Sequence, residues 1–256
     1  MSDFVAKDSI ARAIWGDADL VLLVFAGAAA EFALNRAVDW LFFTGAIPRD
    51  PVGRLLSTAG FASEIVFADE QAARQTVAKI NGIHRAVERA RGKAIPEWAY
   101  RDVLYMLVDY SERSFELLRR PLRDAEREDL YAVYRRIAQL MHIPAVAASY
   151  GEWQADRRRH LERDLVCSPY TAKLYTSYRR QLGAWRYRVL LQLQAVLVPD
   201  SVRELLALHF SPLTRDVCRL LGRLHGSGLR TLLRRLILPV KYLSAINRLD
   251  RGTDYR

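Results

Sequence analysis

The sequence predicts an all-α fold, in which a single helical domain covers residues 1–256. Apolar residues recur every three or four positions over long segments, as on one face of a helix. Short β-branched runs that alternate between apolar and polar residues are nearly absent, which argues against a sheet. Prolines mark the breaks between the periodic segments: Pro96, Pro121, Pro144, Pro169, Pro199, Pro212 and Pro239.

These breaks predict helices over residues 9–15, 18–44, 51–68, 70–90, 97–119, 124–141, 149–165, 170–197, 200–208, 212–225 and 229–238. The apolar run from Leu20 to Ala30 is too short to span a bilayer and suits a buried central helix. Glu31 closes this run. Its carboxylate either has a raised pKa and moves protons during catalysis, or, as we prefer, pairs with Arg36 or another arginine.

The helices expected over 51–68 and 70–90 each have a start signal. Asp50 precedes the first helix, and its carboxylate can accept hydrogen bonds from the free N–H groups of the first turn. Pro51 then supplies a backbone φ angle that suits the first helical position. Asp69 is placed in the same way before the second helix.

These two helices carry the candidate functional residues. Arg54 and Thr58 lie four positions apart, on the same face as Phe61 and Ile65. His84 shares its helix face with three apolar residues: Val77, Ile80 and Val87. A neutral imidazole in an apolar cavity suits a haem iron, and an arginine with a hydroxyl suits a polar ligand or a propionate.

Each candidate also has a purely structural interpretation. A lone histidine on an apolar face is more often a buried, hydrogen-bonded residue than a metal ligand. Spacing alone therefore does not decide the role of His84. Arg54 can form an ion pair between helices, and Thr58 can bond back to its own helix.

The run Asp50-Pro51-x-x-Arg54-Leu55-x-x-Thr58, the segment 61–67 and His84-x-x-Val87 resemble the core signature of the rubber-oxygenase family. That family contains the latex-clearing proteins and the MpaB-type oxygenases. A looser likeness, which includes Tyr100 as a pocket residue, extends over about residues 10–240. The resemblance implies an all-helical core similar to a globin, with haem b and its iron held by a histidine.

Carried over by position, His84 matches the proximal haem ligand and would bind the iron. Arg54 and Thr58 match the distal arginine and threonine, and would serve both cofactor binding and catalysis. Two positions depart from the family pattern: Ser57 replaces a lysine of the latex-clearing proteins, and Asp109 stands where many members have a histidine.

The resemblance implies a haem-dependent oxygenase or peroxygenase-like enzyme. Its partners would be a small apolar substrate, an isoprenoid or a natural product, and dioxygen or a peroxide. The alternative is a helical haem- or lipid-binding protein that keeps the family fold without the chemistry.

The net charge of +10 could favour binding to nucleic acid, but the sequence shows no helix-turn-helix, zinc-finger or RNA-stacking signature, and acids are interspersed among the arginines. We therefore expect no nucleic-acid partner, and a solvated helix near residues 156–164 with His160 exposed.

Cys167 and Cys218 show neither metal-ligand nor disulfide spacing. With no apparent signal peptide or membrane span, we expect a cytoplasmic protein. Peripheral contact with a membrane is compatible with this expectation.

Overall fold

A computed structural model describes residues 2–43, 49–223 and 234–251 of the chain. The predicted all-α fold class is confirmed: within these ranges no β-strand forms, and two isolated bridges join Asp3 to Asp69 and Asn35 to Leu165. No described helix is both long and apolar enough to cross a membrane.

The helices, in chain order, are α1 (Ile10–Trp15), α2 (Ala18–Phe32), α3 (Val38–Phe43), α5 (Pro51–Phe67), α6 (Glu70–Arg91), α7 (Glu97–Leu118), α8 (Asp124–Leu140), α9 (Tyr150–Arg163), α10 (Pro169–Leu197), α11 (Asp200–Leu205), α12 (Pro212–Arg223) and α14 (Val240–Asn247). Residues 234–237 are also helical.

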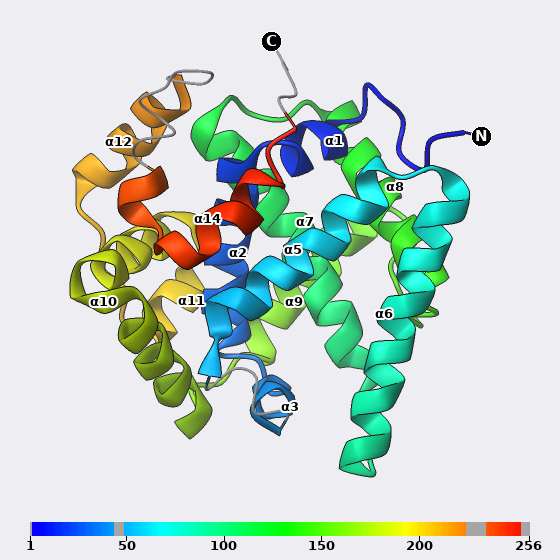
Figure 1. Cartoon of the computed structure of the whole chain (residues 1–256), viewed down its shortest axis with the longest axis horizontal. Coiled ribbons are helices and arrows are strands. Elements are labelled where there is room, and N and C mark those ends of the chain that lie inside the picture. The colour runs from blue at the N-terminus through cyan, green and yellow to red at the C-terminus, as the bar shows by residue number, and fades with distance from the viewer. Residues whose placement is uncertain (1, 44–48, 224–233, 252–256) are drawn as a thin grey trace.

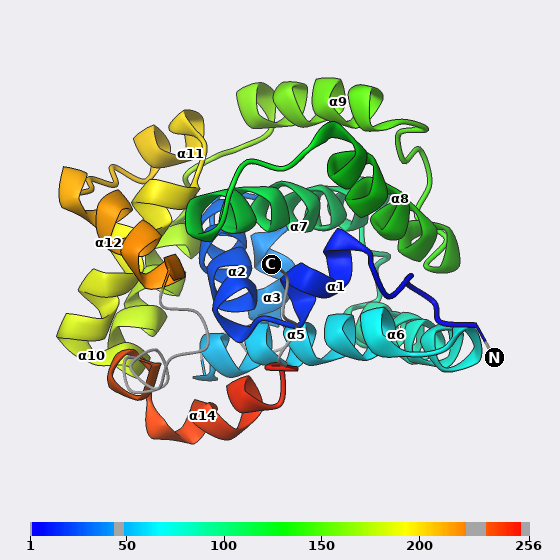
Figure 2. The same cartoon turned by 90° about the horizontal axis from the view of Figure 1, so that it is seen from above.

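Helix α2 is the centre of the molecule. It lies between α5 in front and α7 behind, while α8 and α9 cover the far side of α7 (Figures 1 and 2). Helices α10, α11 and α12 gather at one end, α6 stands beside α5 at the other, and α14 crosses the outside of α5. Nearly every residue of α2 is buried, so the predicted buried central helix is confirmed.

The expected single helix over 18–44 is wrong, because the chain turns between α2 and α3. The buried side chain of Asn35 causes the break. Its Oδ1 accepts a hydrogen bond from the Ala37 N–H at 2.8 Å, and its Nδ2 donates to Asp102 at 3.1 Å. A side chain that bonds nearby backbone competes with the helix ladder.

Other boundaries also differ from the expectation. Gly183, with φ of 74°, kinks α10 in the middle of the expected 170–197 helix. Helix α14 was not predicted. Of the expected helix over 229–238, residues 229–233 lie outside the described residues.

Candidate functional site

Helices α5 and α6 pack side by side, and both begin at the predicted caps. Asp50 accepts a hydrogen bond from the Gly53 N–H at 3.0 Å, and Asp69 accepts one from the Ala72 N–H at 2.9 Å. Tyr242 of α14 also donates to Asp50. Burial opposes the charge on Asp50, but these hydrogen bonds outweigh it and lower the pKa of this carboxyl. The start of α5 is thus fixed from two sides.

His84 lies half-buried on α6, and its Nδ1 atom is buried without a hydrogen-bond partner. Burial and then the positive charge of Arg54 lower the pKa of His84, against a smaller opposite effect of Glu88. The imidazole is therefore neutral at pH 7. Arg54, which is half-buried on the neighbouring helix α5, thus acts on His84 through its charge.

Tyr100 of α7 closes another side of this site. Its ring meets that of His84 edge-on, with centroids 5.1 Å apart. Its hydroxyl lies 3.4 Å from Oε1 of Glu88, which also accepts a hydrogen bond from the Ile95 N–H at 2.9 Å. Burial, followed by the charge of Glu88, raises the pKa of Tyr100 to about 12. Tyr100 therefore stays protonated and can only donate or accept a hydrogen bond.

Thr58 is half-buried on α5, and its hydroxyl donates to the Arg54 carbonyl at 3.1 Å. This is the structural role that the sequence left open, and it leaves the oxygen lone pairs of Thr58 available as acceptors. The neighbouring Ser57 is exposed.

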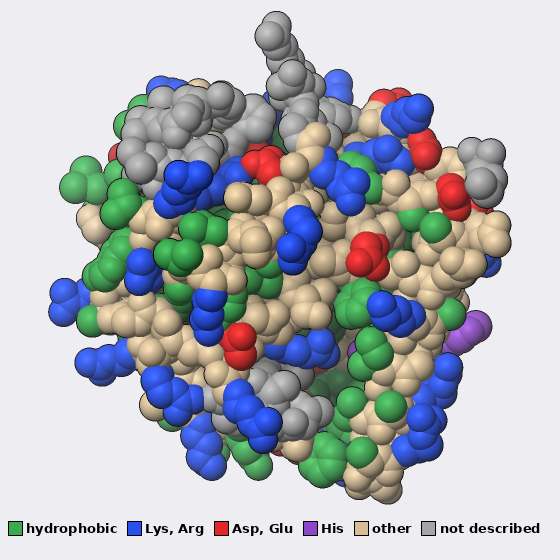
Figure 3. Space-filling view, in the orientation of Figure 1, with side chains coloured by type: hydrophobic (Ala, Val, Ile, Leu, Met, Phe, Trp, Pro, Cys, Tyr) green, Lys and Arg blue, Asp and Glu red, His purple; other side chains and the backbone are tan. Residues whose placement is uncertain are grey.

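The surroundings are apolar with a basic edge. Trp40 and Ala99 belong to a small buried cluster against which Val87 packs. Arg91, at the end of α6, stacks 3.9 Å from the Trp40 ring centroid and pairs with Asp39 at 2.6 Å. Figure 3 shows a hollow in the surface beside α6, rimmed by hydrophobic side chains.

No group of three or more histidine, cysteine, aspartate or glutamate side chains in the described part of the chain could hold a metal ion. A haem needs only one or two protein ligands, because the porphyrin supplies the others. The neutral, unpartnered imidazole of His84 fits that requirement.

The acids singled out in the sequence are paired. Arg157 binds Glu31 and Asp109, and Arg113 also binds Asp109 at 2.6 Å. Although burial acts to raise it, the pKa of Glu31 is lowered to about 2 by Arg157. The proton-carrier interpretation of Glu31 is therefore wrong, and the pairing interpretation is right with Arg157 in place of Arg36.

Arg157 and His160 are themselves buried, so the expectation of a solvated helix is wrong at these two positions. Both side chains point from α9 towards acids on α2 and α7. Sequence spacing within α9 carries no signal of these partners, since they lie far away in the chain.

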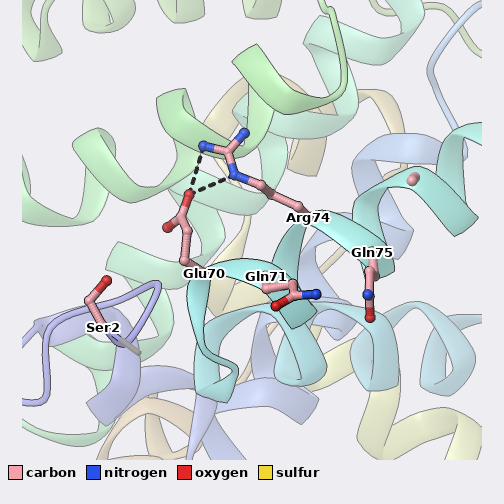
Figure 4. A pocket seen from close by; sticks show the side chains of 6 residues that line it. Ser2, Glu70, Gln71, Arg74 and Gln75 are labelled. Atoms are coloured by element: carbon pink, nitrogen blue, oxygen red, sulfur yellow. Dashed lines mark hydrogen bonds and ion pairs between the residues drawn. The ribbon is translucent and has the colours of Figure 1, made fainter.

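A second depression lies at the start of α6, where Ser2, Glu70, Gln71, Arg74 and Gln75 meet (Figure 4). Glu70 and Arg74 form an ion pair at 2.7 Å, and Glu70 also pairs with Arg136. The carboxylate of Glu70 is thus shared by two arginines.

The family described as ER-bound oxygenase mpaB/B'/Rubber oxygenase, catalytic domain, matches residues 13–231. The chain belongs to this family. The match includes all of α5, α6 and α7, and so every residue of the His84 site, while α14 lies outside it. Membership in the MpaB and rubber-oxygenase family confirms the resemblance drawn from the Arg54 and His84 motifs. No curated protein and no solved structure matches the chain.

Proposed function

We propose that this member of the oxygenase family is a haem-b-dependent oxygenase, or a peroxygenase-like enzyme, that oxidises an apolar organic substrate. The observation that supports this most is the half-buried imidazole of His84, which is neutral and whose Nδ1 atom is buried without a hydrogen-bond partner. His84 would hold the iron, while Arg54 and Thr58 would contact the cofactor or the oxidant.

When bound, haem supplies the redox chemistry that activates dioxygen or a peroxide. The side chains supply the rest. Burial and then the charge of Arg54 lower the pKa of His84, and the guanidinium of Arg54 is suited to stabilise negative charge on an oxygen atom or to bind a propionate. The Thr58 oxygen, whose hydrogen is donated to the Arg54 carbonyl, keeps lone pairs that would accept a hydrogen bond from a ligand. Trp40 and Val87 limit the access of water.

The apolar walls favour an isoprenoid or another apolar natural product over a charged substrate. A reducing compartment such as the cytoplasm agrees with the two free thiols, Cys167 and Cys218. Both points are part of the proposal.

The test of the cofactor is a visible spectrum of protein produced with an adequate supply of haem. We expect a Soret band that His84→Gly removes or shifts, and that added imidazole restores by replacing the missing side chain. His209→Gly, at an exposed histidine, is the matched control and should leave the band unchanged. A protein without a Soret band, or a band indifferent to His84→Gly, would refute the haem site.

Catalysis needs a separate measurement. Oxygen or peroxide consumption with isoprenoid and aromatic candidates should fall by about 100-fold in Arg54→Gln. Arg74→Gln, an exposed arginine on α6, should leave the rate unchanged. If haem binds and no candidate is turned over, the protein is the non-catalytic haem-binding alternative.

A further inference from the structure

A cavity of about 650 Å³ lies between α2, α5, α10, α12 and residues 234–238. Its volume falls within the range of about 300–1,000 Å³ that is usual for small-molecule sites. The walls are almost entirely apolar and include Leu22, Ala26, Leu56, Val189, Leu193 and Cys218. The cavity is therefore large enough and apolar enough to hold a hydrocarbon chain.

Helix α5 separates this cavity from the His84 site. Val52, Leu55 and Leu56 line the cavity, whereas neither Arg54 nor His84 belongs to its lining. Successive helix residues are about 100° apart, so Arg54 lies about 160° around the helix from Val52 and from Leu56, on nearly the opposite side. The cavity is thus a second compartment, distinct from the site proposed for haem.

The amide and hydroxyl side chains of Gln192 and Thr214, which line the cavity, are hydrogen-bonded. Thr214 donates to Gln192 Oε1 at 2.9 Å, and Gln192 in turn donates to the His209 carbonyl at 2.9 Å. Asp19 is the only acid among the described lining residues, and Arg234 pairs with it. A ligand therefore meets no unpaired acid within the described walls.

Two further arginines of α10, Arg186 and Arg188, belong to the lining. Among the described residues no ion pair joins either of them to a carboxylate. Arg186 Nε donates to the Leu236 carbonyl at 3.2 Å, which fixes its guanidinium beside the cavity. Their two positive charges lack protein counterions in the described structure and are complementary to an anionic group.

The cavity opens to solvent along α12. Leu213 and Val217 line it and are yet 70% and 52% exposed. Hydrophobic and basic side chains intermix over this part of the surface, around α10, α12 and α14 (Figure 3). An amphiphilic molecule would find an apolar entrance beside positive charge.

We propose that this cavity binds a long-chain carboxylate, with the chain between α2, α5 and α10 and the head group at Arg186 and Arg188. This site goes beyond the proposed oxygenase activity and needs no haem. The chain provides affinity through burial of its methylene groups, and the arginines select an anion over a neutral or cationic head.

The test is displacement of a fluorescent polyene fatty acid by carboxylates of increasing length, below their micelle concentrations. Affinity should rise by about fourfold for each added methylene until the cavity is full. Hexadecanol and hexadecylamine should bind at least tenfold more weakly than hexadecanoate. Binding that ignores chain length, or that is equal for the three head groups, would overturn the proposal.

Variants locate the site. Ala26→Phe fills the cavity from α2 and should abolish binding, whereas Ala132→Phe, on the exposed face of α8, should not. Arg186→Gln with Arg188→Gln should remove the preference for an acid, while Arg179→Gln on the same helix keeps it. His84→Gly should bind the acid normally, so a failure of the haem proposal can be distinguished from a failure of the fatty-acid proposal.

A measurement on the unaltered chain guards against misfolded variants. Cys218 lines the cavity and Cys167 is exposed outside it. Hexadecanoate should slow the maleimide labelling of Cys218 and leave that of Cys167 unchanged. Equal labelling rates with and without the acid would show that the cavity is only a packing void. The same conclusion would follow if Ala26→Phe stabilised the protein and the parent protein bound no acid.

Discussion

Arg157 holds both carboxylate oxygens of Glu31, each at 2.5 Å, although the two residues are 126 positions apart. The Glu31 side chain is fully buried and that of Arg157 is 4% exposed. Tyr110 donates a further hydrogen bond to Glu31 at 2.9 Å, and Arg157 also binds Asp109 at 2.8 Å. This buried charge network joins α2, α7 and α9.

The first prediction is that Arg157→Met destabilises the protein strongly. The substitution leaves the carboxylates of Glu31 and Asp109 buried without their cation, a loss that costs about 3–5 kcal/mol. Arg158→Met, at the next and exposed position, should change the free energy of unfolding by no more than about 0.5 kcal/mol. Denaturant unfolding compares the two variants, and similar losses in both would contradict the role of the network.

The second prediction concerns pH and His160. Its ring nitrogens lie 3.6 Å from Glu31, 3.5 Å from Asp102 and 3.4 Å from Asp164, while Arg157 acts in the opposite direction. Burial lowers the pKa of His160, but the acids outweigh it and the net shift is upward. The protonated ring therefore stabilises the fold at low pH, and this contribution is lost as the pH rises from about 6.5 through the higher folded pKa.

His160→Asn should remove this dependence. Between pH 6 and pH 9, the free energy of unfolding of the parent protein should fall relative to that of the variant. His142→Asn, at an exposed histidine, should run parallel to the parent. Parallel curves for all three proteins would show that His160 has the same pKa in the folded and unfolded states.

Local signals made much of the fold predictable. Asp50 and Asp69 act within three residues of themselves, and both were found as caps from the sequence. The break after α2 was missed because Asn35 depends on Asp102, which is 67 positions away. A polar residue inside an apolar pattern indicates a buried group that needs a hydrogen-bond partner, but the pattern does not identify that partner when it is distant in the chain.

The same limit applies to the candidate site. The pattern placed Arg54 and His84 on successive helices, and these two helices pack side by side in the structure. It gave no sign that Glu88 would bridge Tyr100 and the Ile95 backbone. Nor did it show that Tyr242 would bind Asp50, because that contact depends on how α14 crosses α5.

The third prediction tests the close contact of α2 and α7. A Cβ atom on Gly27 would overlap the ring of Tyr110, which is fully buried and cannot move aside freely. Gly27→Ala should cost about 1–3 kcal/mol of stability. Gly151, in the exposed face of α9, has open space around it, so Gly151→Ala should instead stabilise the protein by up to about 1 kcal/mol. Thermal unfolding distinguishes the signs, and a neutral Gly27→Ala would contradict the tight packing.

The last prediction concerns Ser57, which is exposed beside half-buried Thr58 and stands where latex-clearing proteins have a lysine. If haem binds at His84 as proposed, the short side chain of Ser57 would leave the iron without the lysine ligand, and the iron should accept cyanide or imidazole readily. Ser57→Lys adds an amine that binds iron when neutral, and should weaken cyanide affinity by about tenfold, more so at higher pH.

Ser57→Gln is the control, since it lengthens the side chain without adding an amine. Absorption titrations of the haem-loaded protein with cyanide measure the three affinities. A parent protein whose iron is already low-spin with two protein ligands at neutral pH would contradict the open site. That result would leave the role of His84 standing, because the His84→Gly spectrum tests that role separately.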